Sequence, residues 1–157
     1  MNAQFSKIIC PVDFSEASEN ALTQAVALAE QSGAELVLLT VVMPVPAAAY
    51  SEGMLFAELG SLPDHSTDAA EKRLSALRKT FCSKLRERAS TQLAVGIPFV
   101  EIVRYARDVK ADLIVMGSHG LTGIEHLLIG SVAERVVRKA PCSVLVVRDE
   151  NRRFVMP

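Results

Sequence analysis

The sequence predicts an α/β protein built on a parallel β-sheet, and three observations support this fold class. Short apolar runs alternate five times with segments whose apolar residues recur at helical spacing. The apolar runs are almost continuous, as in strands that are covered on both faces. Glycine and proline stand where segments begin or end. Because parallel strands are joined by right-handed crossovers, we expect an open sheet with helices on both faces.

Each element follows from its own local pattern. The strands are predicted at 7–13, 34–42, 90–96, 112–117 and 142–148. The helices are predicted at 15–33, 67–89, 98–111 and 131–140. Gly33 suits the end of the first helix. Pro98 suits the first turn of the third helix, where a missing N–H costs nothing, and Pro141 ends the last helix.

The segment 43–66 departs from this alternation. It contains three prolines and two glycines and has no sustained period, so we expect a long loop. Because the loop follows the second strand, it could form a lid or a partner surface, and a disordered excursion is the alternative. The whole chain, 1–157, is expected to form one domain.

Composition excludes several classes of function. The chain has 157 residues, of which 50% are hydrophobic and 22% charged, and its net charge is −1. This net charge does not indicate a broad basic surface that would bind nucleic acid or an anionic membrane. No apolar run approaches the roughly 18 residues of a membrane span, and the start lacks the order of a signal peptide. We therefore expect a cytoplasmic protein without membrane insertion. Cys10, Cys82 and Cys142 form no CxxC pair, so we interpret them as small buried residues.

The expected ligand position lies at the carboxyl ends of strands, where strand order reverses. The first strand runs into "PVDFS" and the fourth into "GSHG". If these strands are neighbours, Asp13 and Gly117 face one crevice. The sequence alone leaves that adjacency open.

The stretch "MGSHGLTGIEHLLIGS", residues 116–131, carries four glycines and two serines but no lysine or arginine. Glycines allow backbone to approach a ligand closely. The first turn of the following helix offers unpaired N–H groups and a positive dipole end, which hold a phosphate without lysine. Neither GxxxxGK[ST] nor a GxGxxG after the first strand is present. A simple connection between strand and helix is the alternative.

The spacing Gly117-x2-Gly120-x9-Gly130-Ser131 resembles the nucleotide motif of the universal stress protein family. "IICPVDFSEASENAL", "ADLIVMGSHG" and "APCSVLVVR" are also similar to the opening, middle and closing segments of that family. The resemblance extends from about Lys7 to Arg148. It implies a Rossmann-like fold with strand order 3-2-1-4-5 and binding of ATP in members that keep the glycines.

The resemblance also implies the residues that bind the nucleotide. From the adenosine end to the phosphates, they are Pro11, Val12, Asp13, Val41, Met116, Gly117, His119, Gly120, Gly130, Ser131 and Val132. Val41 would meet the base mainly through its backbone. ATP with Mg²⁺ is the expected ligand, no residue is assigned to catalysis or to a metal, and another adenine nucleotide is also compatible.

Several of these residues have a second interpretation. Asp13 could cap the helix at 15, and Ser131 is an N-cap by local rules. His119 is either a phosphate donor or an ordinary loop histidine. Ser118 could contact the ligand, although nothing local requires it. The segment 125–126, Glu-His, falls in the variable part of the motif.

The function expected from these features is that of an ATP-binding regulatory protein in the stress response, a sensor or switch. The resemblance implies a homodimer, in which an antiparallel contact covers the last strand at Val144, Leu145 and Val146. The alternatives are a slow ATPase and a dimeric adaptor that needs little or no nucleotide. The motif contains no arginine or lysine that could stabilise a transferred phosphoryl group, so we expect at most slow ATP hydrolysis. We also expect a protein partner, which the sequence does not identify.

Overall fold

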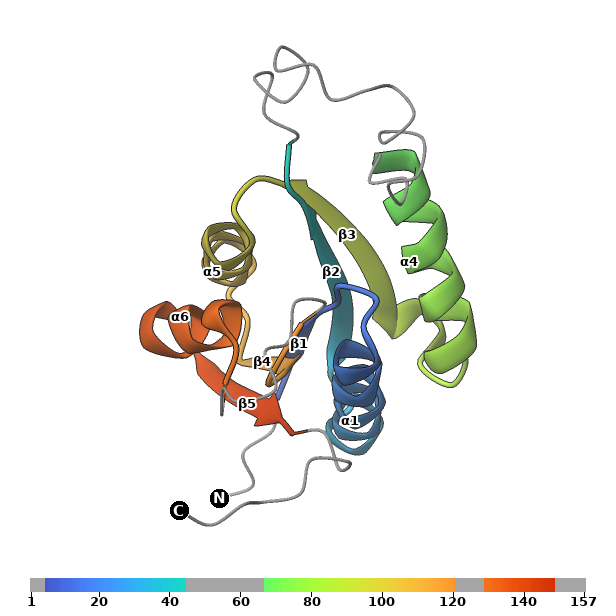
Figure 1. Cartoon of the computed structure of the whole chain (residues 1–157). Helices are drawn as coiled ribbons and strands as arrows, with labels where there is room; N and C mark the ends of the chain where they lie inside the picture. The colour runs from blue at the N-terminus through green and yellow to red at the C-terminus, as the bar shows by residue number, and fades with distance from the viewer. Residues whose placement is uncertain (1–4, 45–66, 121–128, 149–157) are drawn as a thin grey trace.

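The computed structural model describes residues 5–44, 67–120 and 129–148, and these form a five-stranded sheet (Figure 1). Every neighbouring pair of strands is parallel. In the order β3-β2-β1-β4-β5, the strands are Ala89–Val95, Glu35–Val42, Lys7–Pro11, Leu113–Gly117 and Ser143–Val147. The predicted fold class and the strand order 3-2-1-4-5 are confirmed.

Helices cover both faces of this sheet. The helices α1 (Glu16–Ser32) and α4 (Thr67–Phe81) lie on one face, and α5 (Pro98–Asp108) and α6 (Ser131–Lys139) lie on the other (Figure 1). Alternate residues of β1 pack against the helices on opposite faces of the sheet. Ile8 and Cys10 pack towards α1, and Ile9 packs towards α5 and α6. Both faces of β1 are therefore buried, which explains its continuous apolar sequence.

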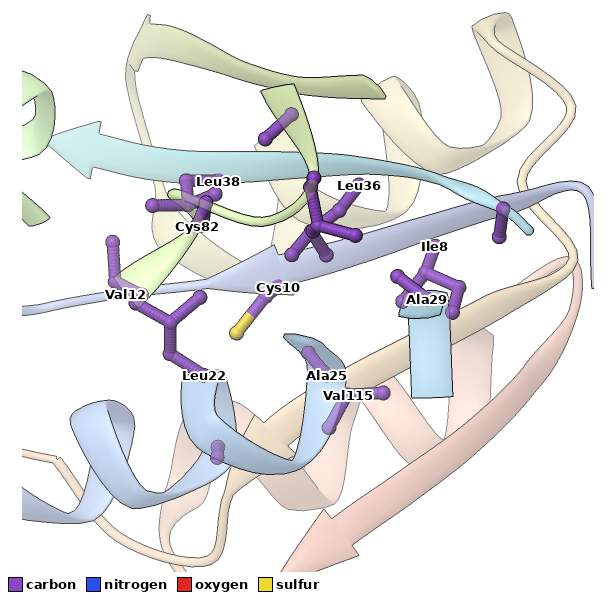
Figure 2. Packing of buried hydrophobic residues seen from close by; sticks show 14 of the residues in the cluster. Ile8, Cys10, Val12, Leu22, Ala25, Ala29, Leu36, Leu38, Cys82 and Val115 are labelled. Carbon is purple, nitrogen blue, oxygen red and sulfur yellow. The ribbon is translucent and has the colours of Figure 1, made fainter. Parts of the chain in front are cut away.

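Helix α1 lies close to the sheet because small residues form its inner face. Ala21, Ala25 and Ala29 are fully buried, and Leu22 fills the space between the helix and the strands (Figure 2). Burying a leucine side chain of this kind stabilises the fold by about 2 kcal/mol. This packing also brings the first turn of α1 to the end of β4, where Ala17 lies against Gly117.

The ends of α1 are set by local chemistry. Ser15 is the N-cap, and its hydroxyl accepts a hydrogen bond from the N–H of Ser18 at 3.2 Å. Gly33 adopts a left-handed φ of 76°, and its N–H donates to the carbonyl of Ala29 at 3.0 Å. The predicted end of this helix at Gly33 is confirmed.

The predicted helix at 67–89 is too long, since α4 ends at Phe81. Beyond it, the chain turns with Leu85 buried and forms a short 3₁₀ helix, η1 (Arg86–Arg88), before β3 begins. Arg78 fixes this turn, because its Nε donates to the carbonyl of Ala89 at 2.6 Å. The apolar period continues to Leu85, so the sequence pattern alone does not show where the helix stops.

Other predicted boundaries also differ from those in the structure, mostly by one residue. Strand β1 ends at Pro11 rather than at 13, α5 ends at Asp108 rather than at 111, and β3 begins one residue early, at Ala89. Of the predicted loop at 43–66, only Met43 and Pro44 belong to the described residues. No helix in the described ranges is long and apolar enough to span a membrane.

Candidate functional site

Strands β1 and β4 lie side by side at the centre of the sheet, with Ile8 opposite Leu113 and Ile9 opposite Ile114. The chain continues from β1 to β2 on one side and from β4 to β5 on the other. Strand order therefore reverses between β1 and β4. We call the carboxyl ends of these two strands the switch point, which is where open parallel sheets bind ligands.

The turn after β1 holds the carboxylate of Asp13 at the switch point. Its Oδ1 accepts hydrogen bonds from the backbone N–H of Ser15 at 3.0 Å and from the Ser15 hydroxyl at 2.5 Å. Phe14 lies between the two residues with a φ of 65°, which is unusual for a residue other than glycine. The expectation that Asp13 itself caps α1 is wrong, because Ser15 takes that position and Asp13 orients its hydroxyl.

The turn after β4 passes directly against this carboxylate. A Cβ atom at Gly120 would lie 2.5 Å from Oδ2 of Asp13, and a Cβ atom at Gly117 would lie 2.9 Å from the carbonyl oxygen of Ala17. Backbone cannot move aside cheaply, so the contact with Ala17 requires glycine at position 117, whereas a side chain at Gly120 would displace the carboxylate of Asp13. The structure thus brings together Asp13, Gly117 and Gly120, as predicted, and the chain's own packing requires the glycine at 117.

The backbone of Ser118 links this turn to β5 and to the start of α6. Its N–H donates to the carbonyl of Val147 at 2.9 Å, and its carbonyl accepts from the N–H of Gly130 at 2.6 Å. Gly130 is the N-cap of α6 and makes no side-chain cap, so the expectation that Ser131 is the N-cap is wrong. Ser131 and Val132 are instead the first helical residues, whose N–H groups have no acceptor inside the helix.

His119 follows at the outer side of the same turn. Its Nδ1 lies 2.9 Å from the hydroxyl oxygen of Ser118, whose side chain is 2% exposed. The imidazole is half-buried. A hydroxyl in contact with one ring nitrogen fixes which nitrogen points inward.

On the other side of the switch point, β2 supports the end of β1. Pro11 pairs with Leu39, and the next N–H, that of Val12, donates to the carbonyl of Leu39 at 2.8 Å. The buried hydroxyl of Thr40 donates to the carbonyl of Val12 at 2.5 Å. Sequence analysis missed Thr40, although a single hydroxyl inside the apolar run 36–42 was a usable signal.

Three predicted residues face the core rather than the switch point with their side chains. Met116 is buried in the apolar cluster beneath α5 and α6, and Val41 and Val132 are partly buried against that cluster. Val41 also pairs with Ala94 in the sheet. Any contact that these residues make with a ligand must therefore involve mainly backbone atoms.

The cysteines are separate from this site. Burial raises the pKa of Cys82 to about 11 and raises the pKa of Cys10 far above its usual range. Burial also raises the pKa of the half-buried Cys142 thiol. Protonated thiols are poor nucleophiles and poor metal ligands. Within the described residues, no three His, Cys, Asp or Glu side chains are grouped so that they could hold a metal ion. The segment 121–128, which includes the predicted 125–126 pair, lies outside the described residues.

The strand order and the glycine-rich switch point define a doubly wound α/β protein. The model of the universal stress protein family matches residues 4–148. The chain therefore belongs to the universal stress protein family.

Individual relatives cover almost the whole chain. Universal stress protein MJ0531 of Methanocaldococcus jannaschii is 35% identical over 148 residues, which cover 94% of this chain and 85% of the relative. Universal stress protein MJ0577 of the same organism is 31% identical over 163 residues, which cover 96% of this chain and 99% of the relative.

Solved structures agree with the fold. The structure of MJ0577 superposes with a TM-score of 0.76 at 34% identity, covering 94% of this chain and 99% of that one. A universal stress protein solved in complex with cAMP gives a TM-score of 0.63 at 26% identity, with 92% and 98% covered.

Proposed function

We propose that this protein binds ATP with Mg²⁺ at the switch point and acts as a nucleotide-dependent sensor or switch in a stress response. One observation carries the proposal. The Asp13 carboxylate, the turn at Gly117–Gly120 and the N-cap of α6 at Gly130 meet at the carboxyl ends of β1 and β4. Family membership supports a stress-related role, and the relative solved with cAMP supports an adenine nucleotide as the ligand.

In this proposal, the two sides of the switch point bind different parts of the nucleotide. Pro11, Val12 and the backbone of Val41 contact the adenosine, and the carboxylate of Asp13 accepts a hydrogen bond from a ribose hydroxyl. The phosphates lie between the turn after β4 and the start of α6. Their proposed contacts are Met116, Gly117, His119, Gly120, Gly130, Ser131 and Val132.

The phosphate contacts depend mainly on backbone donors. Gly130 has no side chain to occupy the first-turn N–H groups of α6, which suits an incoming phosphate. The helix dipole contributes only about 0.3–1 kcal/mol, whereas micromolar affinity requires about 8 kcal/mol. Direct hydrogen bonds and contacts with the base must therefore supply most of the binding free energy. Mg²⁺ would partly neutralise the phosphate charge, and the phosphates themselves would be its principal ligands.

The glycine spacing places the chain, in this proposal, in the ATP-binding subgroup of the family. The competing function is a dimeric adaptor, and one observation favours it. Gly117 is already required by its close contact with the backbone of Ala17, so its presence does not depend on a ligand. Strand β5 lies at the sheet edge with Leu145 40% exposed, and we propose it as the homodimer contact, from Val144 to Val146.

The remaining expectations also stay proposals. Slow ATP hydrolysis is possible only as a weak side activity, because the motif supplies no cation for the transferred phosphoryl group. AMP could replace ATP as the bound nucleotide. The proposal also includes a single domain over 1–157 with a long loop at about 43–66. It further includes a cytoplasmic location and an unidentified protein partner.

The test uses a shape-matched pair at Gly130 that differs in charge. Its φ of −72° is open to any residue, and Gly130→Asp and Gly130→Asn place side chains of the same shape against the carbonyl of Ser118. Both are good N-caps, so α6 should persist in each variant. Calorimetric titration with ATP and Mg²⁺ should give saturable micromolar binding for the natural chain. We expect roughly tenfold weaker binding in Gly130→Asn and a further loss of about tenfold in Gly130→Asp, because the carboxylate repels phosphate.

The possible outcomes separate the candidate functions. Equal affinities for all three chains would place the nucleotide away from α6 and overturn the proposed site. Absence of binding by the natural chain would favour the adaptor. If ATP binds, release of phosphate measured over hours, with AMP titrated in parallel, distinguishes the switch from the slow ATPase and fixes the preferred nucleotide.

A further inference from the structure

Ser118 is a buried polar side chain at the switch point that the proposed function leaves unused. Its side chain is 2% exposed, and its hydroxyl contacts Nδ1 of His119 at 2.9 Å. Its backbone is fixed independently, by hydrogen bonds with Val147 and Gly130. The hydroxyl therefore has a rigid base from which to hold the imidazole.

The direction of this hydrogen bond follows from donor and acceptor counts. A serine hydroxyl has one proton, and a neutral imidazole has one N–H donor and one acceptor nitrogen. Among the described residues, the Ser118 hydroxyl has no other side-chain or backbone partner than the ring of His119. If Nδ1 donated to the hydroxyl, the buried hydroxyl proton would have no acceptor there, which is unfavourable. Donation from the hydroxyl to Nδ1 satisfies this proton.

We propose that Ser118 is a positioning residue that donates to Nδ1 of His119 and thereby keeps the ring proton on Nε2, where the neutral imidazole donates to a nucleotide phosphate. Phosphate oxygens at this site are acceptors, so a ring that presented a bare nitrogen to them would repel the ligand. Hydrogen bonding at one ring nitrogen is a general way to fix the protonation of the other. This inference rests on the proposed function, since it assigns His119 a phosphate contact.

The first measurement needs no nucleotide. The ¹⁵N chemical shifts of His119, followed over a pH series, report which ring nitrogen carries the proton in the neutral form. We expect a protonated Nε2 and an unprotonated, hydrogen-bonded Nδ1. In Ser118→Ala, the Nδ1 resonance should move towards the value of an exposed histidine. A protonated Nδ1 in the natural chain would overturn the proposal.

The second measurement compares ATP with adenosine in a double-mutant cycle. Ser118→Ala should weaken ATP binding about threefold to tenfold and leave adenosine binding unchanged, because adenosine has no phosphate. In a His119→Ala background, Ser118→Ala should have no further effect, since the ring that it positions is gone. Ser32→Ala is the matched control, because it removes a hydroxyl that donates to the Leu28 carbonyl at 2.7 Å, at the far end of α1.

The outcomes keep the two proposals distinguishable. If ATP binds the natural chain but Ser118→Ala weakens it equally with and without His119, Ser118 acts through packing and this inference fails while the proposed function stands. If adenosine is weakened as much as ATP, the inference also fails. If the natural chain binds no ATP, the proposed function and the phosphate contact fail together, and the ¹⁵N spectrum still decides whether Ser118 directs the ring.

Discussion

Two carboxylates occupy opposite ends of the same strand pair, and their surroundings differ. Asp112 precedes β4, and its Oδ2 accepts the backbone N–H groups of Ser6 and Lys7, each at 2.8 Å, at the start of β1. Asp13 follows β1, and its Oδ1 is bonded to Ser15 while its Oδ2 faces the glycine turn after β4.

We infer from this difference that the amino end of the strand pair is structural and that the carboxyl end is the proposed binding end. At the amino end, the Asp112 carboxylate spans the two strands, and the Asp112 N–H returns a hydrogen bond to the carbonyl of Lys7 at 2.9 Å. At the carboxyl end, Oδ2 of Asp13 lies against Gly120 in the turn after β4. Asp13 thus lies at the end of the sheet where open parallel sheets bind ligands, whereas the Asp112 carboxylate is bonded to strand backbone at the opposite end.

The largest expected effect comes from Asp112→Ala. This change leaves two backbone N–H groups without their acceptor, and we expect the free energy of unfolding to fall by about 2 kcal/mol. The value lies below the sum for two buried bonds because the carboxylate is exposed. Urea denaturation measures the loss, and ATP affinity should stay within about twofold. A tenfold loss of affinity in a folded Asp112→Ala protein would erase the distinction between the two ends.

Asp13→Ala should show the opposite pattern. We expect ATP affinity to fall about tenfold, equivalent to about 1.4 kcal/mol, with a smaller loss of unfolding free energy because Ser15 still caps α1. Calorimetry and urea denaturation on the same samples measure both quantities. Asp13→Asn is the matched control, since it keeps an oxygen for Ser15 and removes only the charge. A variant that loses stability but binds ATP normally would make Asp13 a second structural carboxylate.

Much of this comparison could be predicted from the sequence. The five alternations of strand and helix predicted the fold class, and the strand order inferred from the family resemblance placed Asp13 beside Gly117 and Gly120. Both N-caps lie at a different residue from the one considered in the sequence. Asp13 and Ser15 are both acceptable N-cap residues for α1, and Gly130 and Ser131 are both acceptable for α6. Which one caps depends on where the preceding strand or turn ends, and that is a tertiary property.

Other features lie beyond local pattern. The turn after α4 is set by Arg78 reaching the carbonyl of Ala89, a contact between residues that do not share a helix. The contacts of Thr40 and Ser118 appear only when strands and turns meet, although each was visible as a lone hydroxyl beside an apolar run. Side-chain periodicity reports which face is buried, and it carries no information about such polar contacts.

Cys82, in the apolar core, should have a smaller, pH-dependent effect on the free energy of unfolding. Because burial raises the pKa of Cys82 from 9.0 to about 11, its thiol ionises in the unfolded chain before it does so in the folded one. Its contribution to stability is complete below pH 9 and is lost as pH rises towards 11. We expect the free energy of unfolding to fall by roughly 1 kcal/mol by about pH 10, and Cys82→Ala should reduce this slope. An unchanged slope would show that Cys82 is ionised to the same extent in both states.

The smallest expected effect comes from the contact between Arg73 and Phe14, which lies next to Asp13 at the proposed binding end. Phe14 keeps its left-handed φ of 65° directly after Asp13, and the guanidinium of Arg73 on α4 lies 4.0 Å from the centre of its ring. A cation–π contact at an exposed site contributes about 0.5–1 kcal/mol. Arg73→Ala should therefore lower the unfolding free energy by about 0.5 kcal/mol and weaken ATP binding about twofold, as the turn that carries Asp13 becomes less well ordered. The neighbouring exposed cation gives the control, because Lys72→Ala removes the same charge from α4 without touching Phe14. Equal effects from both variants would mean that general charge acts on the nucleotide, whereas an effect confined to Arg73→Ala would tie α4 to the geometry of the β1–α1 turn.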